Sequence, residues 1–223
     1  MELSEIITTP MFRGLSEEEA ERALTVLKAA QRRYRKGAVL MHAGEHTERM
    51  GLVLSGSVTI ESCDLWGNRA ILSHVGSGQF FAESYALLPD APMLVDVTAN
   101  EDCTVLFLRP GPLVRQEVKT PWAEKLTANL LLISARKNLH LSARSFHTAP
   151  KTIRARVLSY LNAVSLQTGS REFEIPFDRQ QMADYLNVER TALSKELGRM
   201  KREGFFTCRK NRFILLRDDL GEI

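Results

Sequence analysis

Hydrophobic and polar positions change their spacing several times along the 223 residues. Ser16 with Glu19 three residues later predicts the start of a short helix, because this pair forms a capping box. From residue 31 to 109, short apolar runs alternate with glycine-bearing turns such as Lys36-Gly37 and Gly76-Ser77-Gly78. Short strands interrupted this regularly predict an antiparallel β-barrel or jelly roll.

A long helix is predicted from Thr120-Pro121, where threonine can cap the helix and proline fits its first turn, to about Ala143. Its middle is apolar on more than one face, which indicates two packing partners. We expect these to be the barrel and the same helix of a second subunit, with Leu126, Leu130 and Ile133 on the shared seam. A core helix in a monomer is the alternative, because the pattern covers fewer than three heptads.

Residues 178–200 predict two short helices separated by a turn. A helix-turn-helix needs a small residue where the helices cross, a turn residue that tolerates left-handed backbone, and an apolar residue that holds the second helix. Ala183, Asn187 and Leu193 fit these three positions. Further on, two alternating strands joined at Lys210-Asn211 predict a β-wing, so a winged helix is expected.

The second of these helices is expected to contact DNA through its outer face. Leu193, Leu197 and Met200 should face inward, whereas Arg202 and the contact residues remain outside. A recognition helix reads base edges in the major groove and is positioned by phosphate contacts. The predicted contact residues are Arg190, Thr191, Ser194, Lys195 and Arg199. The alternative is a solvated face on which Glu196 and Glu203 pair with the cations.

Charge and composition narrow the functional classes. The net charge is +3, and residues 151–223 hold 14 Lys and Arg against 10 Asp and Glu, so the positive excess lies in the last third. Such a margin fits DNA binding only if the cations cluster in space. Cys63, Cys103 and Cys208 are too few and too widely spaced for a disulfide framework or a metal knuckle, so reduced thiols are expected.

No catalytic residues, metal site or cofactor are expected, because the sequence has no nucleophile and base pair, phosphate loop or metal motif. It also has no membrane-length apolar run and no signal-like N-terminus, which favours a soluble protein of the cytoplasm with no membrane partner.

Four stretches, taken in this order, resemble the cAMP receptor protein and FNR (Crp/Fnr) family of bacterial transcription factors. They are FRGLSEEEAERAL, RKGAVLMHAGEHTERMGLVLSGSVTI, GSGQFFAES and DRQQMADYLNVERTALSKELGRMKREGFF. The resemblance covers nearly the whole chain. It implies an α+β fold with a cyclic-nucleotide-binding-like effector barrel over residues 1–110, a central dimerisation helix and hinge over 111–147, and a winged helix-turn-helix over 148–223.

The same resemblance implies the partners. They are a second copy of the chain in a homodimer, a palindromic operator in double-stranded DNA, a small-molecule effector in the barrel, and RNA polymerase. Members of the family commonly carry a glutamate after the first arginine of the recognition helix, where this chain has Thr191. The usual half-site is therefore not expected, although half-sites about one helical turn apart are.

The effector is not expected to be cAMP. By resemblance, Glu83 falls on the glutamate that holds the ribose in cyclic-nucleotide binders, but Met93 and Leu94 fall where those proteins hold the phosphate with arginine and serine. No Lys or Arg lies between Arg69 and Arg109, so a buried phosphodiester would lack a cation. We expect an uncharged or weakly acidic organic ligand instead. Its predicted pocket comprises Glu83, Ser84, Tyr85, Met93, Leu94 and Leu139.

Several alternatives compete with this sensor. The iron–sulfur branch of the family that this chain resembles needs four cluster cysteines, several of them near the N-terminus, and none precedes Cys63 here, so that sensor is excluded. A haem member would need an axial histidine in the barrel, and a haem is disfavoured because nothing pairs His74 with a second ligand. A packed barrel without any ligand, in a DNA-binding dimer, remains open. A cupin-like metalloenzyme would use His42, His46 and Glu48, but the two histidines are four apart across a turn rather than on one face of a strand.

Overall fold

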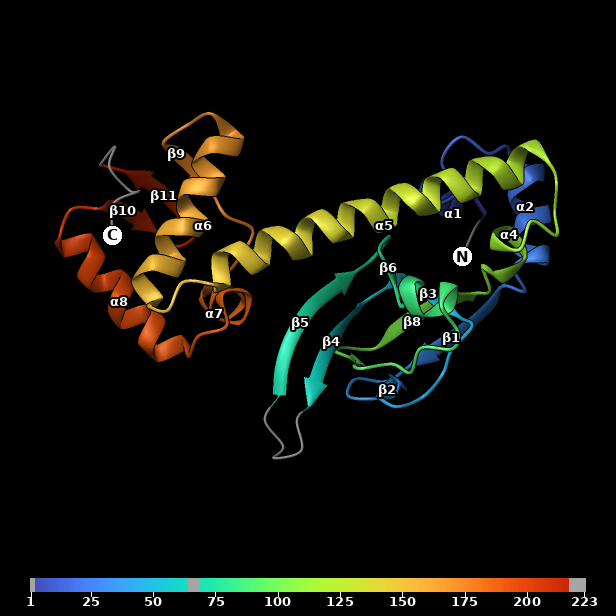
Figure 1. Ribbon diagram of the computed structural model, residues 1–223, viewed down its shortest axis with the longest axis horizontal. Helices are drawn as coiled ribbons and strands as arrows, with labels where there is room; N and C mark the ends of the chain where they lie inside the picture. The colour runs from blue at the N-terminus through green and yellow to red at the C-terminus, as the bar shows by residue number, and fades with distance from the viewer. Residues whose placement is uncertain (1–2, 64–68, 217–223) are drawn as a thin grey trace. The chain divides into compact units, whose positions relative to one another are not determined.

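The computed structural model describes residues 3–63 and 69–216, and the chain divides into two compact units, Met1–Asn138 and Leu139–Ile223. Helix α5, Pro121–Thr148, runs from the first unit into the second (Figure 1). The first unit also contains α1 Leu3–Ile7, α2 Glu17–Val26, β1 Ala30–Tyr34, β2 Val39–Met41, β3 Met50–Ser55, β4 Ser57–Cys63, β5 Arg69–Gly76, β6 Phe80–Phe81, α3 Glu83–Leu87, β7 Asp96–Ala99, β8 Cys103–Leu108 and α4 Gly111–Val114. The second contains α6 Ile153–Thr168, β9 Glu172–Glu174, α7 Arg179–Leu186, α8 Arg190–Arg202, β10 Phe206–Arg209 and β11 Arg212–Leu215.

The first unit is built on two antiparallel four-stranded sheets, with strand orders β1-β8-β3-β6 and β2-β7-β4-β5. Apolar side chains such as Val53, Val58 and Val105 form the core of this barrel. Phe81 lies so close to β3 that a Cβ on Gly51 would be 2.1 Å from its ring, so only glycine fits there. The predicted all-β barrel is confirmed, as is the α+β fold class.

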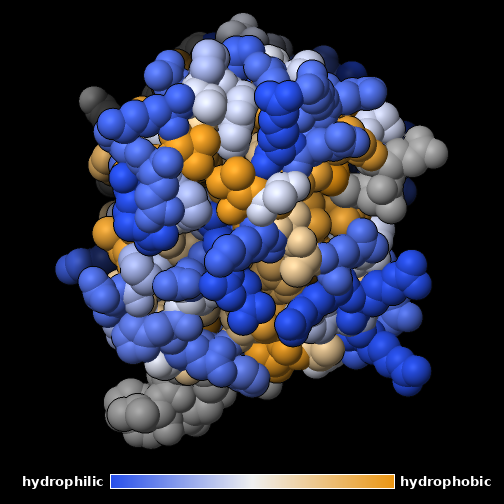
Figure 2. Space-filling view, turned by 90° about the vertical axis from the view of Figure 1, so that its right-hand side faces the viewer, coloured by the Kyte–Doolittle hydropathy of each residue, from blue (hydrophilic) through white to orange (hydrophobic). Residues whose placement is uncertain are grey.

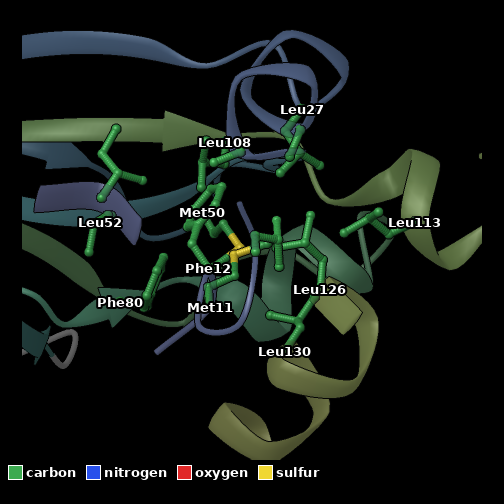
Figure 3. Packing of buried hydrophobic residues seen from close by; sticks show 14 of the residues in the cluster. Met11, Phe12, Leu27, Met50, Leu52, Phe80, Leu108, Leu113, Leu126 and Leu130 are labelled. Atoms are coloured by element: carbon green, nitrogen blue, oxygen red, sulfur yellow. The ribbon is translucent and has the colours of Figure 1, made fainter. Parts of the chain in front are cut away.

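A second apolar core lies between the barrel and its helices (Figure 3). Met11 and Phe12, which precede α2, meet Leu126 and Leu130 of α5 there, and Ile133 belongs to the same cluster. The prediction that Leu126, Leu130 and Ile133 form a seam with a second subunit is therefore wrong. These side chains are the apolar face that α5 turns toward its own barrel.

Helix α5 keeps a different apolar face exposed. Leu131, Leu132 and Leu139 are 69%, 55% and 71% exposed, so the helix is indeed apolar on more than one side. It also continues to Thr148, five residues beyond the predicted end at Ala143. The polar residues after Ala143 do not stop a helix, whereas Pro150 disfavours helical backbone at the residue before it.

The second unit is a winged helix. Asp178 and Gln181 form a capping box at the start of α7, and Asn187 ends this helix in the left-handed conformation, with φ 52° and ψ 55°. Strands β10 and β11 pair around Lys210, whose φ is 53°, and β9 adds a third strand. The helix-turn-helix, its asparagine turn and the wing are confirmed by this arrangement.

Candidate nucleic-acid interface and effector site

Helix α8 has one buried and one exposed face. Leu193, Leu197 and Met200 are at most 4% exposed, as the sequence predicts. The residues opposite them recur at the same helical spacing and form the outer face, which we define as Thr191, Lys195, Gly198 and Arg202, flanked by Arg190, Ser194 and Arg199. All five predicted DNA-contacting residues are exposed. Gly198, at the centre of the face, was not among them.

The residue just before α8 is its N-cap, Glu189, which was not among the predicted site residues. The carboxylate of Glu189 accepts hydrogen bonds from the backbone N–H groups of Thr191, at 2.8 Å, and Ala192, at 2.7 Å. These bonds lower the pKa of Glu189, so it stays ionised. A negative charge at this end of a helix is favourable because the helix dipole is positive there.

Acidic side chains of α8 point toward α6. Arg154 of α6 lies 2.7 Å from Glu196 and 2.8 Å from Glu203, and its guanidinium stacks over the ring of Phe205 at 5.5 Å. Glu203 also pairs with Arg199, at 2.9 Å, so the solvated-face alternative holds for that one cation. Within the described residues, no ion pair involves the three remaining cations of the face, which are Arg190, Lys195 and Arg202.

Two arginines hold the turn between α7 and α8. Arg144 of α5 donates from Nη2 to the carbonyl of Asp184, at 2.7 Å, and from Nε to that of Tyr185, at 2.9 Å. Arg156 of α6 donates to the carbonyls of Leu186, at 3.1 Å, and Asn187, at 2.7 Å. The last carbonyls of a helix have no partner within it and carry partial negative charge, so cations there are favourable.

Aromatic groups pack around the same turn. Nδ1 of His147 and the hydroxyl of Tyr185 form a hydrogen bond of 2.9 Å, and the ring of Tyr160 contacts both residues. Burial lowers the pKa of His147 and raises that of Tyr160, so both are neutral near pH 7. These contacts were not predictable from local sequence patterns, because the partners of Arg144 and His147 lie about forty residues away.

The six predicted effector residues have different surroundings. Met93 is 1% exposed within the barrel core, whereas Leu94 is 72% exposed, because adjacent residues of an extended segment point to opposite sides. Ser84 and Leu139 are exposed, and Leu139 belongs to the second unit. Tyr85 accepts a hydrogen bond from the N–H of Leu94 at 3.2 Å. That these residues bind an organic ligand stays a prediction.

Glu83 is the member of this set with a distinctive environment. Its side chain is 6% exposed, and Oε2 lies 2.6 Å from Nζ of Lys137 on α5. Lys137 also donates to the carbonyl of Phe80 at 2.6 Å. The barrel sequence lacks a cation in this region, and α5 supplies one from 54 residues further on. Lys137 was not among the predicted site residues, because it lies outside the barrel sequence.

A cavity of about 270 Å³ lies elsewhere, near the ends of α2, α3 and α4. Figure 2 faces the α2 and α4 end of the molecule and shows apolar surface between strongly hydrophilic side chains. The charged residues of the cavity are Lys28, Glu48, Arg109 and Arg115. Arg109 pairs with Glu48, and Arg115 pairs with Glu117, so two of its three cations already have carboxylate partners.

Other predicted sites have ordinary surroundings. Among the residues that the structure describes, no three His, Cys, Asp or Glu side chains gather as metal ligands would, and His42 of the cupin-like set faces Asp96 at 3.8 Å. His74 bonds to Thr59 at 3.0 Å. Cys103 and Cys208 are free thiols. Over the same described ranges, every helix is too short or too polar to cross a membrane.

Comparison with known proteins finds a known domain in each of the two units. The sequence pattern of the cyclic nucleotide-binding domain matches residues 31–115, and that of the Crp-like helix-turn-helix domain matches residues 155–221. The transcriptional activator protein FnrL of Cereibacter sphaeroides is 23% identical over 84% of this chain and 76% of its own. The chain belongs to the Crp/Fnr family of transcription regulators.

Other similar proteins fit this Crp/Fnr assignment. The cyclic AMP receptor protein of Thermus thermophilus is 28% identical over 69% of this chain and 70% of its own. The fold matches the c-di-GMP responsive global regulator CLP of Xanthomonas campestris with a TM-score of 0.63 at 18% identity, covering 91% of this chain and all of that one. These Crp/Fnr relatives are transcription regulators and not enzymes, so the cupin-like metalloenzyme hypothesis is abandoned.

Proposed function

We propose that this regulator binds a palindromic operator in double-stranded DNA as a homodimer, with the outer face of α8 in the major groove. The observation that carries the proposal is the charge of that face. Arg190, Lys195 and Arg202 are exposed, while Glu196 and Glu203 are held by Arg154. A cationic face on a rigidly supported helix fits phosphate contacts and guanine recognition.

The five predicted contact residues are expected to contribute differently to DNA binding. Arg190 and Lys195 can reach guanine or phosphates, and Thr191 and Ser194 can reach a base edge or a thymine methyl group. Arg199 must first leave its ion pair with Glu203, so we expect a smaller contribution from it. Gly198 and Arg202 join the interface because they lie on the same row of α8 as Lys195.

Dimerisation is proposed through the exposed apolar face of α5. Leu131, Leu132 and Ala135 are exposed in the first unit, and Leu139 continues the spacing after a further turn. Such a face on a long helix is costly in water and is typical of a helix that pairs with another copy. Leu132→Glu should convert the dimer to a monomer in sedimentation, whereas Leu88→Glu, at an equally exposed leucine of α3's C-terminal end, should not.

We propose that the protein binds DNA without a small-molecule effector, because the contacts in the barrel favour this alternative. Of the residues expected to form an effector pocket, Met93 is packed in the barrel core, Leu94 is exposed, and the carboxylate of Glu83 already has a cationic partner in Lys137. A ligand such as the cyclic AMP or c-di-GMP named for two relatives would have to displace or rearrange this ion pair. We also propose a cytoplasmic location, because a protein that binds an operator must share a compartment with the DNA. RNA polymerase stays a predicted partner.

Selection of bound sequences from a random pool of duplex DNA tests the function. The purified protein should select a palindrome with half-sites about one helical turn apart. Arg190→Ala should relax selection at defined positions, at a cost of about 1–3 kcal/mol, while Arg33→Ala removes the same charge from β1 and should leave the motif intact. Binding that weakens with salt but selects no motif would contradict the proposal.

A further inference from the structure

One face of α5 packs on the barrel, and it ends in a charged residue. Leu126, Leu130, Ile133 and Lys137 recur at intervals of three or four residues, so they lie on one side of the helix. The first three are in the apolar core. Apolar contacts of this kind hold a helix against a surface but specify its rotation weakly, because similar side chains can exchange places after a small shift.

Lys137 makes the specific contact at the end of this face. Its ammonium group lies 2.6 Å from Oε2 of Glu83 and 2.6 Å from the carbonyl oxygen of Phe80. Glu83 is the first residue of α3, and the preceding Ala82 has a left-handed backbone with φ 59°, so the position of the carboxylate is fixed from its own side as well. A buried carboxylate requires a partner, and only one rotation of α5 provides it.

Glu83 is buried, with 6% of its side chain exposed, whereas Lys137 keeps 37% of its side chain exposed. An ion pair with a buried partner contributes little net stability compared with apolar residues of the same size. Desolvation of the Glu83 carboxylate offsets much of its attraction to the ammonium group. Its better-attested role is to select one arrangement among several of similar energy. The 2.6 Å pair, at the end of an otherwise apolar contact, fits that role.

We infer that Lys137 is a positioning residue. Its ion pair with Glu83 sets the rotation of α5 on the barrel, and this rotation presents Leu131, Leu132 and Ala135 to a second copy of the chain without any small molecule. The inference rests on the proposed function, because it specifies what prepares the dimer that binds DNA. In this proposal Lys137 prepares α5 for dimerisation, a role that was expected of a bound effector.

The test compares two lysines of α5. Lys125 also pairs with a glutamate of the first unit, Glu19 at 3.7 Å, and also donates to a backbone carbonyl, that of Gly14 at 3.2 Å, but this pair is more exposed. Lys125→Met is therefore the matched control. The main variant is Glu83→Gln with Lys137→Met, which removes both charges and leaves no unpaired carboxylate inside the protein.

Dimer dissociation is measured by sedimentation and operator binding by fluorescence anisotropy, with no small molecule added. The double variant should unfold at nearly the temperature of the wild-type protein but should dimerise and bind the operator roughly tenfold more weakly. Lys125→Met should stay within about twofold of wild type. Equal dimerisation of the double variant and the wild type would overturn the inference, as would an equal loss in Lys125→Met.

Chemical rescue provides a second measurement in case the double variant does not fold. The substitution Lys137→Ala removes three methylene groups and the ammonium group, and the Glu83 carboxylate then faces the space that they occupied. Added propylammonium chloride should restore dimerisation of Lys137→Ala and not change Lys125→Ala, with sodium chloride as the ionic-strength control. No restoration would contradict the inference. The proposed function fails separately, if the wild-type protein is a monomer or selects no operator.

Discussion

Gly198 provides the sharpest test of the proposed DNA face. It lies inside α8, where glycine destabilises a helix by about 0.5–1 kcal/mol relative to alanine. Apart from the two chain neighbours and the nearby backbone of α8 itself, no atom of the protein would lie within 4 Å of a Cβ added at Gly198, and the residue is exposed. The packing of the chain therefore gives no reason for glycine here. The reason that fits is close approach of another molecule to this side of the helix.

Gly198→Ala should change stability and DNA binding in opposite directions. Stability should rise by about 0.5–1 kcal/mol, because alanine loses less backbone entropy on folding and meets no clash. On the DNA, the new methyl group would occupy the centre of the face between Lys195 and Arg202. Losing the fit of one base contact costs about 1–3 kcal/mol, which corresponds to roughly fivefold to 150-fold weaker operator binding.

Both quantities are measured on the same preparations. Urea unfolding followed by circular dichroism gives the free energy of unfolding, and anisotropy of a labelled operator gives the affinity at one fixed salt concentration. Asn162→Ala is the control, because Asn162 is an exposed residue of α6 and alanine also raises helix propensity there. It should stabilise the protein and leave operator binding unchanged.

Two results would refute the reasoning about this face. If Gly198→Ala stabilises the protein and binds the operator as well as the wild type, the centre of the outer face does not approach DNA. If the variant is less stable than the wild type, the helix at Gly198 is not the open, unstrained one that the structure describes. Weaker binding with unchanged stability would support the DNA contact but not the helix-propensity argument.

Three further predictions concern the supports of the two units. Arg144→Lys keeps the charge but loses the fork that binds two carbonyls of α7, so hydrogen exchange at the turn should accelerate, and more so in Arg144→Met. Gly51→Ala should destabilise the barrel by about 1–3 kcal/mol in urea unfolding, because its Cβ would overlap the ring of Phe81. Burial lowers the pKa of His147, so the unfolded chain binds a proton that the folded chain does not. Stability should therefore be constant above about pH 6.5 and fall below it, and His147→Gln should reduce this slope in unfolding measured from pH 7.5 to 5.

Features set by neighbouring residues were predictable from the sequence. The left-handed turn at Asn187 follows from one residue type, and the capping box of Ser16 and Glu19 from a spacing of three. The inward row of Leu193 and Leu197 follows from helical periodicity. Each of these features depends on contacts within one turn or one helix, which is the range over which the identity of a residue constrains the backbone.

Features that depend on distant partners were not predictable. The apolar pattern of α5 indicated two packing faces, but it did not say that Leu126 and Leu130 meet the barrel while Leu132 remains outside. Composition alone cannot distinguish such faces, because leucine suits either partner. For the same reason, the absence of a cation from the barrel sequence did not reveal that Lys137 would approach Glu83 from another helix.

The charge of the proposed DNA face depends on where the charged residues lie, and the net charge of the segment does not predict it. Residues 151–223 have an excess of only four positive charges, and a random arrangement of them would give α8 no strong potential. Glu189 is engaged at the start of the helix, and Arg154 of α6 holds Glu196 and Glu203 on the side away from the outer face. The hydrogen bond from Arg154 also lowers the pKa of Glu203, so this carboxylate stays charged and paired. A small excess of charge thereby becomes a cationic surface, and it does so through an arginine that lies on a different helix from the residues proposed to contact DNA.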